Sequence, residues 1–330
     1  MAVLVTGGAG YIGSHMVWRL LDAGEEVVVI DNLSTGHAWS VPGNAHFIEG
    51  DIDDPLVLAR ASAAAPLDAV VHFAGSVVVP DSIREPLRYY RNNTFATLAP
   101  LEHCVATGIE RFIFSSTAAI YGDTGERPVR ESDEKAPETP YGRSKLMIER
   151  MLDDVARAST LRYASLRYFN VVGADPQQRT GQSTEGASHL LKVACEAATG
   201  KREGMAVFGT DYPTRDGTAE RDFIHVTDLV DAHYLSLKRL REFPENFALN
   251  CGYGHGVSVL DLIRAVKDVS GTDFPVRYQE RRAGDLAQVV ADNTAIRETL
   301  NWAPRHDELS GIVRDALEWE RRLTLRNAPQ

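Results

Sequence analysis

A glycine-rich turn near the start of the chain limits the folds open to it. The apolar run VLVT (3–6) leads directly into TGGAGYIG, and an amphipathic helical pattern begins near Tyr11. Gly7, Gly10 and Gly13 therefore lie between a strand and a helix, where glycine lets the backbone turn tightly and leaves the helix N-terminus open. This order predicts the first unit of a doubly wound α/β sheet.

The first half of the chain continues the same alternation. Further apolar runs occupy 27–30, 46–48, 69–74, 112–116 and 164–169, and helical patterns occupy 11–24, 55–65, 86–108 and 140–158. Near-continuous Val, Ile and Phe runs of this length are typical of parallel strands buried on both faces. We therefore predict a doubly wound parallel α/β sheet of the Rossmann type in residues 1–175. Residues 176–330 are expected to form a smaller α/β lobe, with part of 221–252 returning to the large sheet.

Acidic residues follow the second and third predicted strands. Asp31 lies 18 residues after Gly13, at the end of the second strand. Helix N-terminal N–H groups bind a pyrophosphate, and a carboxylate at this point accepts hydrogen bonds from the adenosine ribose and repels a 2′-phosphate. The pattern predicts NAD rather than NADP. Asp51 and Ile52 are expected to end the third strand beside the adenine, although a simple polar turn explains these two nearly as well.

The stretch PYGRSK places Tyr141 four residues before Lys145, on one face of a helix. Thr139 is predicted to cap this helix and Pro140 to lie in its first turn. A tyrosine pKa near 10 is lowered by a lysine ammonium and by the positive nicotinamide of oxidised NAD. We predict that Tyr141 is a base with a pKa brought towards neutrality. A tyrosine packed on a lysine stem is the structural alternative.

The fifth predicted strand ends in Ser115, Ser116 and Thr117. Ligands of open α/β sheets bind at the carboxyl ends of the strands. Thr117 is therefore predicted to hydrogen-bond the substrate oxygen that loses its proton.

Taken together, TGGAGYIGSH, DNLSTG, GDI, HFAG, YYRNN, FSSTAAIYG, PYGRSK and LRYFN resemble the UDP-glucose 4-epimerases, which are extended short-chain dehydrogenase/reductases. The resemblance spans nearly the whole chain, because VFGTDYPTRDGTAERDFIHVTDL (207–229) and RRAGDL (281–286) are similar to that family's substrate lobe. It implies NAD-dependent, reversible epimerisation at C4 of a UDP-hexose through a 4-keto intermediate. Tyr141 would be the base, Lys145 would hold the nicotinamide ribose, and Thr117 would assist.

By the same resemblance, two further sets of residues are assigned. The cofactor set is Gly7, Gly10, Tyr11, Ile12, Gly13, Asp31, Asn32, Asp51, Ile52, Phe73, Ala74, Gly75, Asn92, Ser115, Tyr141, Lys145 and Tyr168. The substrate set is Thr117, Tyr141, Asn170, His189, Leu190, Arg221, Arg282, Asp285 and Val289. Exposed arginines that form surface salt bridges are the alternative for these positions, and for Arg281 alone we keep that interpretation.

Related activities differ in the residues that they require. Sugar-nucleotide dehydratases and decarboxylases need a carboxylate just after the threonine of the fifth strand, where this chain has Ala118 and Ala119. A dehydrogenase with exchangeable cofactor and a non-catalytic NAD sensor stay open, although sensors commonly lose the tyrosine or lysine.

The chain departs from the family at three positions. His189 stands where the family usually has Asn, and Val77 where many members have Lys. Val289 stands where an aromatic residue in some members closes the pocket against acetylated sugars. A 4-epimerase of UDP-N-acetylhexosamines or UDP-pentoses is therefore an alternative, as is a Val289 that only fills core space.

Composition bounds the partners and the location. A net charge of −11 argues against nucleic acid and anionic membranes, and no apolar run approaches the roughly 18 residues of a membrane span. With no secretory signal at the N-terminus, a cytoplasmic protein is expected. The three cysteines are widely spaced, which predicts neither a disulfide framework nor a metal site.

The resemblance implies a homodimer. The apolar residues that fit such a contact, or packing within one chain, are Leu98, Leu101, Met147 and Met151.

Overall fold

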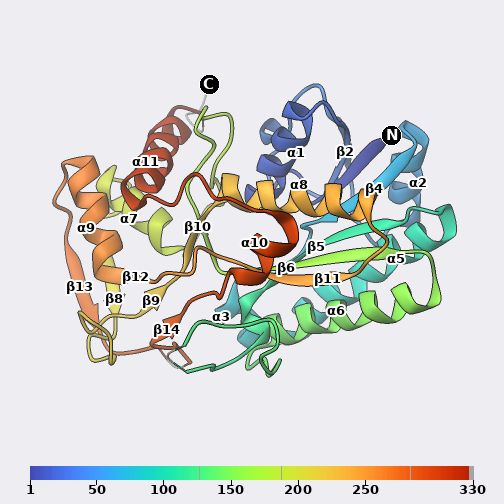
Figure 1. Cartoon of the computed structure of the whole chain (residues 1–330). Helices are drawn as coiled ribbons and strands as arrows, with labels where there is room; N and C mark the ends of the chain where they lie inside the picture. The colour runs from blue at the N-terminus through green and yellow to red at the C-terminus, as the bar shows by residue number, and fades with distance from the viewer. Residues whose placement is uncertain (126, 187, 283, 327–330) are drawn as a thin grey trace.

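A large parallel sheet forms the centre of the computed structural model, which describes residues 1–326 except 126, 187 and 283 (Figure 1). Its seven strands lie in the order β11-β6-β5-β4-β1-β2-β3 and all neighbours pair in parallel. The predicted doubly wound sheet is confirmed. The strands are β1 (Ala2–Thr6), β2 (Glu26–Asp31), β3 (His46–Glu49), β4 (Leu67–His72), β5 (Arg111–Thr117), β6 (Arg162–Tyr168) and β11 (Phe247–Cys251).

The order of the strands reverses between β1 and β4. From β1 the chain proceeds outwards to β2 and β3, and it then returns to build β4, β5 and β6 on the other side of β1. The connections leaving β1 and β4 therefore diverge, and a crevice opens at the carboxyl ends of these strands. One expectation is wrong in detail, because β3 ends at Glu49 and Asp51 lies beyond it in a turn.

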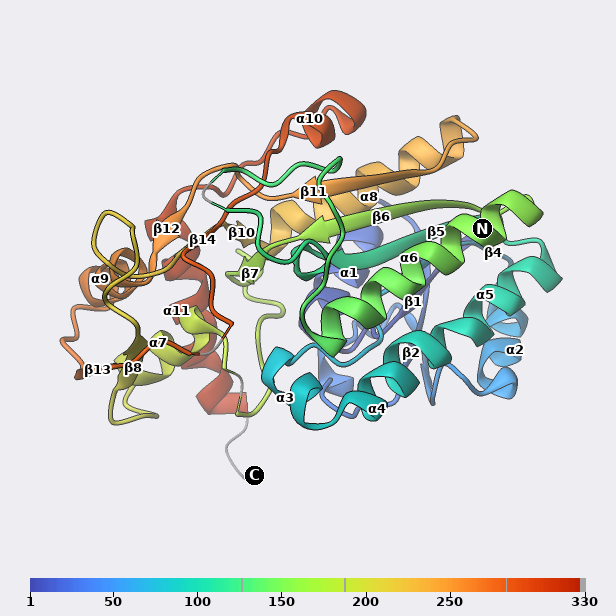
Figure 2. The same ribbon diagram turned by 90° about the horizontal axis from the view of Figure 1, so that it is seen from below.

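Helices cover both faces of the large sheet (Figure 2). One face packs against α1 (Tyr11–Asp22) and α8 (Val226–Glu242), and the other against α2 (Pro55–Ala64), α5 (Ala96–Thr107) and α6 (Pro140–Ala158). Within β1, Val3 and Val5 point to the first face while Ala2 and Leu4 point to the second, as the two-residue period of a strand requires. Each helix lays one apolar face on the sheet, and this burial is the main force that orders the layers.

The long helix predicted over 86–108 is divided. The structure has α4 (Pro86–Tyr89), a π-helical segment η2 (Tyr90–Phe95) and then α5, with the short α3 (Val79–Arg84) before them. A π-helical turn contains more residues than an α-helical one, so it changes which side chains face the sheet. Short 3₁₀ turns occur at η1 (Ala38–Ser40) and η3 (Ala118–Ile120).

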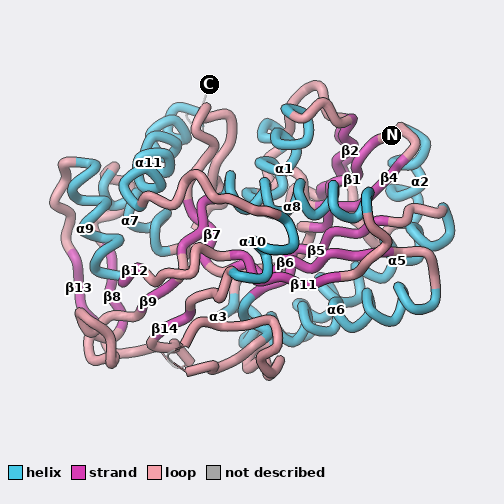
Figure 3. The backbone as a smooth tube through the Cα atoms, viewed as in Figure 1, coloured by secondary structure: helices cyan, strands magenta, loops and turns pink. Residues whose placement is uncertain are grey.

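The second half of the chain builds a smaller α/β lobe (Figure 3). Its apolar core also takes in Leu166 of β6 and Leu249 and Cys251 of β11. It contains short strands that pair as β7 (Asn170–Val172) with β10 (Phe223–His225), as β9 (Glu220–Arg221) with β12 (Val257–Ser258) and β14 (Gln288–Val289), and as β8 (Met205–Phe208) with β13 (Val276–Gln279). Between β10 and β12 the chain returns to the large sheet as α8 and β11. The remaining helices are α7 (Leu190–Ala198), α9 (Val259–Ser270), α10 (Thr294–Leu300) and α11 (Leu309–Arg326).

Neither the cysteines nor the helices of the described residues show a disulfide or a membrane span. Cys104, Cys195 and Cys251 are each buried as free thiols. Among the described residues, no helix combines the length and the apolar character needed to cross a bilayer.

Candidate active site

The glycine turn is held closely against the neighbouring strand end. Gly7 has φ +71°, and a Cβ added there would lie 2.6 Å from the backbone N of Ala74. A Cβ at Gly13 would lie 2.1 Å from the carbonyl oxygen of Gly7, because α1 packs directly on the turn. Gly10 caps α1 without a side chain, and no acidic residue stands in the first turn, where Tyr11 and Ile12 lie. The first amides of α1 are therefore open to an external anion such as a pyrophosphate.

Asp31, the last residue of β2, is hydrogen-bonded to the backbone of this turn. Its Oδ2 accepts the N–H of Ala9 at 2.9 Å, and its Oδ1 accepts the N–H of Leu33 at 2.8 Å. Burial raises the pKa of Asp31, and these backbone hydrogen bonds oppose that rise. Each carboxylate oxygen keeps a further lone pair for a ribose hydroxyl. Asn32 donates to Asp51 Oδ1 at 2.6 Å and so joins the ends of β2 and β3.

The residues after β4 line the same crevice, whereas the Ile52 side chain packs into the core of the large sheet. Phe73, Ala74 and Gly75 follow β4 directly, and Gly75 has φ +151°. A Cβ at Gly75 would lie 3.0 Å from Asn93 Oδ1 and 3.8 Å from Lys145 Nζ, so glycine leaves room for both groups.

The π-helical segment η2 brings in an asparagine that the sequence analysis missed. The predicted Asn92 is exposed and donates to Ser76 Oγ at 2.8 Å. Asn93 is fully buried instead; its Oδ1 accepts the N–H of Ser76 at 2.7 Å and its Nδ2 donates to Ser144 Oγ at 3.0 Å. Asn93 thus joins the crevice to α6. The doubled asparagine of YYRNN was the available signal, but a simple helical pattern does not say which of the two points inwards.

Helix α6 carries Tyr141 and Lys145 into the crevice. Thr139 caps it by accepting the N–H of Gly142 at 3.2 Å, and Pro140 is its first residue, as predicted. Lys145 Nζ donates to the carbonyl oxygen of Ser115 at 3.1 Å. Thr117 accepts the N–H of Ala119 at 3.1 Å, and its hydroxyl is hydrogen-bonded to Tyr141.

The pKa values show what burial does to this group. Burial raises the pKa of Tyr141 to about 12, and its hydrogen bond with Thr117 opposes the rise. Burial lowers the pKa of Lys145 to about 8. These values describe the chain without NAD. The predicted lowering of the Tyr141 pKa by Lys145 together with the oxidised nicotinamide stays a prediction.

A second buried group lies behind Ser115. Its hydroxyl lies 3.2 Å from His233 Nε2, and His233 Nδ1 lies 2.9 Å from the carbonyl oxygen of Leu229. That carbonyl requires the ring proton on Nδ1, so Nε2 accepts the Ser115 hydroxyl. Burial raises the pKa of Tyr168, whose side chain also lies beside Ser115. His233, on α8, was not identified from the sequence because it is far from the motifs.

Apart from Thr117 and Tyr141, the predicted substrate residues lie on the smaller lobe. Val289 of β14 pairs in register with Arg221 of β9, and Asn170 begins β7 with an exposed side chain. Burial lowers the pKa of Arg221, and the charge of Asp285 opposes this, which places the two charges near each other.

The loop before β14 carries two arginines with different surroundings. Arg281 donates to Asp211 Oδ1 at 2.7 Å and lies over the ring of Tyr212, so its interpretation as a surface salt-bridge residue is confirmed. The guanidinium of Arg282 is exposed and lies 3.6 Å from the ring centroid of Phe208. Phe208 and Tyr212 were not identified as site residues, although both lie in the quoted segment 207–229.

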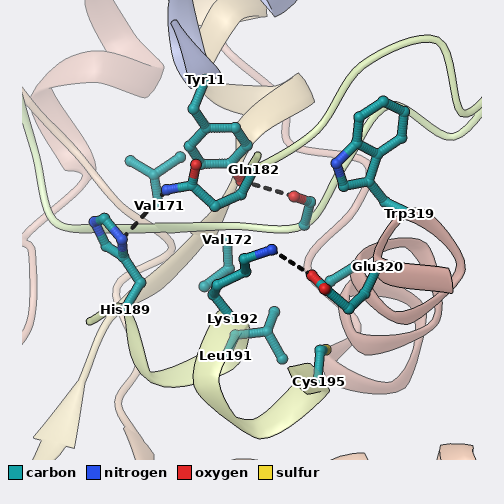
Figure 4. A pocket seen from close by; sticks show the side chains of 12 residues that line it. Tyr11, Val171, Val172, Gln182, His189, Leu191, Lys192, Cys195, Trp319 and Glu320 are labelled. Carbon is teal, nitrogen blue, oxygen red and sulfur yellow. Dashed lines mark hydrogen bonds and ion pairs between the residues drawn. The ribbon is translucent and has the colours of Figure 1, made fainter. Parts of the chain in front are cut away.

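A small cavity separates the first turn of α1 from the start of α7 (Figure 4). Tyr11 donates to the carbonyl oxygen of Gly173 at 2.7 Å on one side. His189 caps α7 on the other side, with Gln182 Nε2 3.3 Å from its Nδ1, and Leu190 is the first residue of α7. The cavity therefore lies between one predicted cofactor residue and one predicted substrate residue.

Three side chains outside the crevice have the spacing of metal ligands. One donor atom each from His225, His306 and Asp315 lies within 4.8 Å of the others. However, His225 Nδ1 accepts the N–H of Thr227 at 3.1 Å, so the neutral ring carries its proton on Nε2, the atom that lies 3.3 Å from Asp315 Oδ2. A protonated nitrogen does not ligate a metal, and we assign no metal to this group.

The fold and the site define a dinucleotide-dependent enzyme of the extended short-chain class. Residues 3–252 match the model of the NAD dependent epimerase/dehydratase family, and the chain belongs to this family. It is 53% identical over 321 residues to the UDP-glucose 4-epimerase of Azospirillum brasilense, a match that covers 97% of this chain and 92% of the relative. A crystal structure of UDP-glucose 4-epimerase has a TM-score of 0.96 at 41% identity and covers 100% of both chains. The UDP-glucose 4-epimerase from Brucella ovis in complex with NAD has a TM-score of 0.93 at 42% identity, covering 96% of this chain and 97% of that one.

Proposed function

We propose that this chain catalyses the NAD-dependent, reversible epimerisation at C4 of UDP-hexoses, converting UDP-glucose and UDP-galactose through a 4-keto intermediate. The observation that carries the proposal is the buried group of Tyr141, Thr117 and Lys145 beside the glycine turn. The relatives named above carry the same activity in their names, at identities far beyond those needed to share a fold.

The residues present fit NAD. Gly7, Gly10 and Gly13 leave backbone close to the open N-terminus of α1, and Asp31 presents carboxylate oxygens to a ribose. When bound, NAD accepts the hydride from C4 of the sugar and later returns it. Lys145 and Ser115 lie where the nicotinamide end would be held, at the carboxyl edge of β5.

Tyr141 accepts and later returns the proton of the C4 hydroxyl. As the phenolate, it takes the proton of the C4 hydroxyl while the C4–H bond gives up its hydride, so that the carbon becomes a ketone. Thr117 is hydrogen-bonded to Tyr141 in the cofactor-free chain, and with substrate bound its hydroxyl donates to the reacting oxygen instead. In the return step Tyr141 gives the proton back to the same oxygen, and the hydride adds to the opposite face.

The substrate must turn within the site while its nucleotide stays in place. Arg221 and Arg282 supply guanidinium groups for the two phosphates, and Asp285 supplies a carboxylate for a ribose hydroxyl. These residues lie on short strands and loops of the smaller lobe, across the crevice from Tyr141. Anchoring at the nucleotide lets the keto sugar present either face.

The first experiment supplies UDP-galactose to the purified protein with no NAD added. Formation of UDP-glucose supports both the reaction and a retained cofactor, because each cycle regenerates NAD. A parallel reaction with UDP-N-acetylgalactosamine measures how open the pocket is beside Val289. Absence of product even after NAD is supplied contradicts the proposal, and the Tyr141→Phe variant is the matched inactive control.

We further propose that the enzyme is a homodimer that uses the surface of α5 and α6. Of the four apolar residues expected there, Leu98 and Met147 are 39% and 43% exposed, and Phe95 beside them is 61% exposed. Leu101 is buried in the core, and Met151 packs against it, so these two fit packing within one chain. A sedimentation mass of 36.3 kDa would contradict the dimer. The three buried free thiols suit a reducing compartment, and we propose the cytoplasm as the location.

A further inference from the structure

A buried carboxylate ties α6 to two strands of the large sheet. Ser116 of β5 donates its hydroxyl proton to Glu149 Oε1 at 2.5 Å. Arg167 of β6 binds the same carboxylate with one edge of its guanidinium, Nε to Oε1 at 3.0 Å and Nη2 to Oε2 at 2.7 Å. The three side chains are buried, so solvent does not compete for these bonds.

The connection extends to the edge of the sheet. Arg167 Nη1 donates to the Tyr121 hydroxyl at 2.8 Å, and that hydroxyl donates to Asn250 Oδ1 on β11 at 2.7 Å. The backbone N–H of Asn250 in turn donates to Glu131 Oε1 at 2.7 Å. The side chains of Ser116, Glu149, Arg167, Tyr121 and Asn250 thus form one connected hydrogen-bond network, which fixes their relative positions.

Glu149 lies on the same face of α6 as the two proposed catalytic residues of that helix. Tyr141, Lys145 and Glu149 follow one another at intervals of four residues, so they lie on one face of the helix. Lys145 and Glu149 each make a hydrogen bond to β5, and Tyr141 bonds Thr117 at its end.

The partners on β5 are consecutive residues. Ser115 offers its carbonyl oxygen, Ser116 its side chain, and Thr117 its side chain. The hydrogen bond between Ser116 and Glu149 therefore fixes the position of α6 along β5. That position also determines how closely Tyr141 and Lys145 approach β5.

Stability alone does not account for this arrangement. Burying a carboxylate and a guanidinium costs desolvation that their attraction only partly repays, and apolar residues of similar volume commonly serve a core as well or better. What the ion pair adds is a defined geometry between three elements, since its bidentate bonds tolerate little displacement.

We propose that Ser116 and Glu149 are positioning residues for the C4 epimerisation, holding α6 in register with β5 so that Tyr141 meets Thr117 and Lys145 meets Ser115. The inference rests on the proposed function. It assigns no contact with substrate or cofactor to either residue.

Ser116→Ala is the principal test, because it removes the hydrogen bond between β5 and Glu149 and leaves the ion pair between Glu149 and Arg167 intact. We expect kcat on UDP-galactose to fall about tenfold with KM within about threefold, since small misplacements of reacting groups are costly. Glu149→Asp keeps the charge and shortens the reach, and kcat should fall up to about 100-fold. If Glu149→Asp fails to fold, Ser116→Ala still decides the matter.

The pH profile separates positioning from simple loss of stability. A looser hydrogen bond from Thr117 lets the pKa of Tyr141 rise, so the acid limb of kcat/KM should move to higher pH in Ser116→Ala. A purely structural role lowers the melting temperature and leaves that limb in place, and this result would overturn the proposal.

Asp68→Asn is the matched control, because Asp68 lies at the amino ends of the strands, away from the crevice. Asp68 is buried near the start of β4 and pairs with Arg111 at 2.8 Å and Arg241 at 2.7 Å. Its loss should lower the melting temperature while kcat stays within about twofold of the parent. Equal losses of kcat in Asp68→Asn and Ser116→Ala, or an unchanged kcat in Ser116→Ala, would each overturn the inference. An inactive parent would instead contradict the proposed function itself.

Discussion

The two sides of the crevice are built differently. On the large sheet, Tyr141, Lys145 and Thr117 stand on a long helix and a central strand and are only 6%, 2% and 7% exposed. On the smaller lobe, Asn170 begins a three-residue strand, and Arg282 and Asp285 lie exposed in a loop. The residues proposed to move a proton are thus buried, whereas three of those proposed to recognise the nucleotide are accessible and the fourth, Arg221, is half-buried.

The difference follows from what each side must do. Burial shifts pKa values and strengthens electrostatic interactions, which proton transfer requires. Recognition of a substrate that enters and turns over requires open space and side chains that adjust. Variants on the two sides should therefore affect different kinetic constants.

Tyr141→Phe should have the largest effect. It removes the only proton acceptor that the proposed mechanism uses, so kcat should fall about 10²- to 10⁴-fold while UDP binding is unchanged. Steady-state kinetics with UDP-galactose and calorimetry with UDP measure the two quantities. A fall in kcat of less than tenfold would mean that another group is the base.

Lys145→Met should stabilise the cofactor-free chain at pH 7. Burial lowers the pKa of Lys145 from 10.5 to about 8, so its protonated form is held in the folded state at a cost of roughly 3 kcal/mol. Between these two values the unfolded chain binds more protons than the folded one, so stability of the parent rises with pH across that window. Urea unfolding at pH 7 and above pH 10 should show a large advantage of the variant at pH 7 that shrinks at the higher pH. An equal advantage at both values would contradict the shift.

Arg282→Ala tests the accessible side. Losing a charged hydrogen-bond donor to phosphate should raise KM for UDP-galactose about 10- to 100-fold with kcat largely retained. Arg281→Ala is the control, because Arg281 is already paired with Asp211 and KM should change less than about threefold. Similar effects of the two variants would remove the distinction between these neighbours.

Val289→Tyr should have the smallest effect and the most selective one. Val289 is half-buried opposite Arg221, and a larger ring there should lower the ratio of kcat/KM for acetylated over plain sugars by about tenfold. The ratio is measured on UDP-N-acetylgalactosamine and UDP-galactose. If it does not change, Val289 only fills space.

Some of the site could be predicted because its signals are local. The apolar runs marked the first six strands of the large sheet, and Thr139 with Pro140 marked the start of α6. Asn93 and His233 could not be found this way. Asn93 points inwards because η2 is π-helical, and His233 reaches Ser115 only because α8 returns to the large sheet.

By itself the sequence determined the doubly wound sheet, the glycine turn and the shared face of Tyr141 and Lys145, because periodicity and turn chemistry act between near neighbours. Only the tertiary structure decided the electrostatic state of that face. In the cofactor-free chain, burial raised the pKa of Tyr141 and lowered that of Lys145, an effect that the spacing of the two residues does not reveal. It also decided that Ser116, Glu149 and Arg167, from three separate segments, meet in one buried network, since desolvation and contact depend on how distant segments pack.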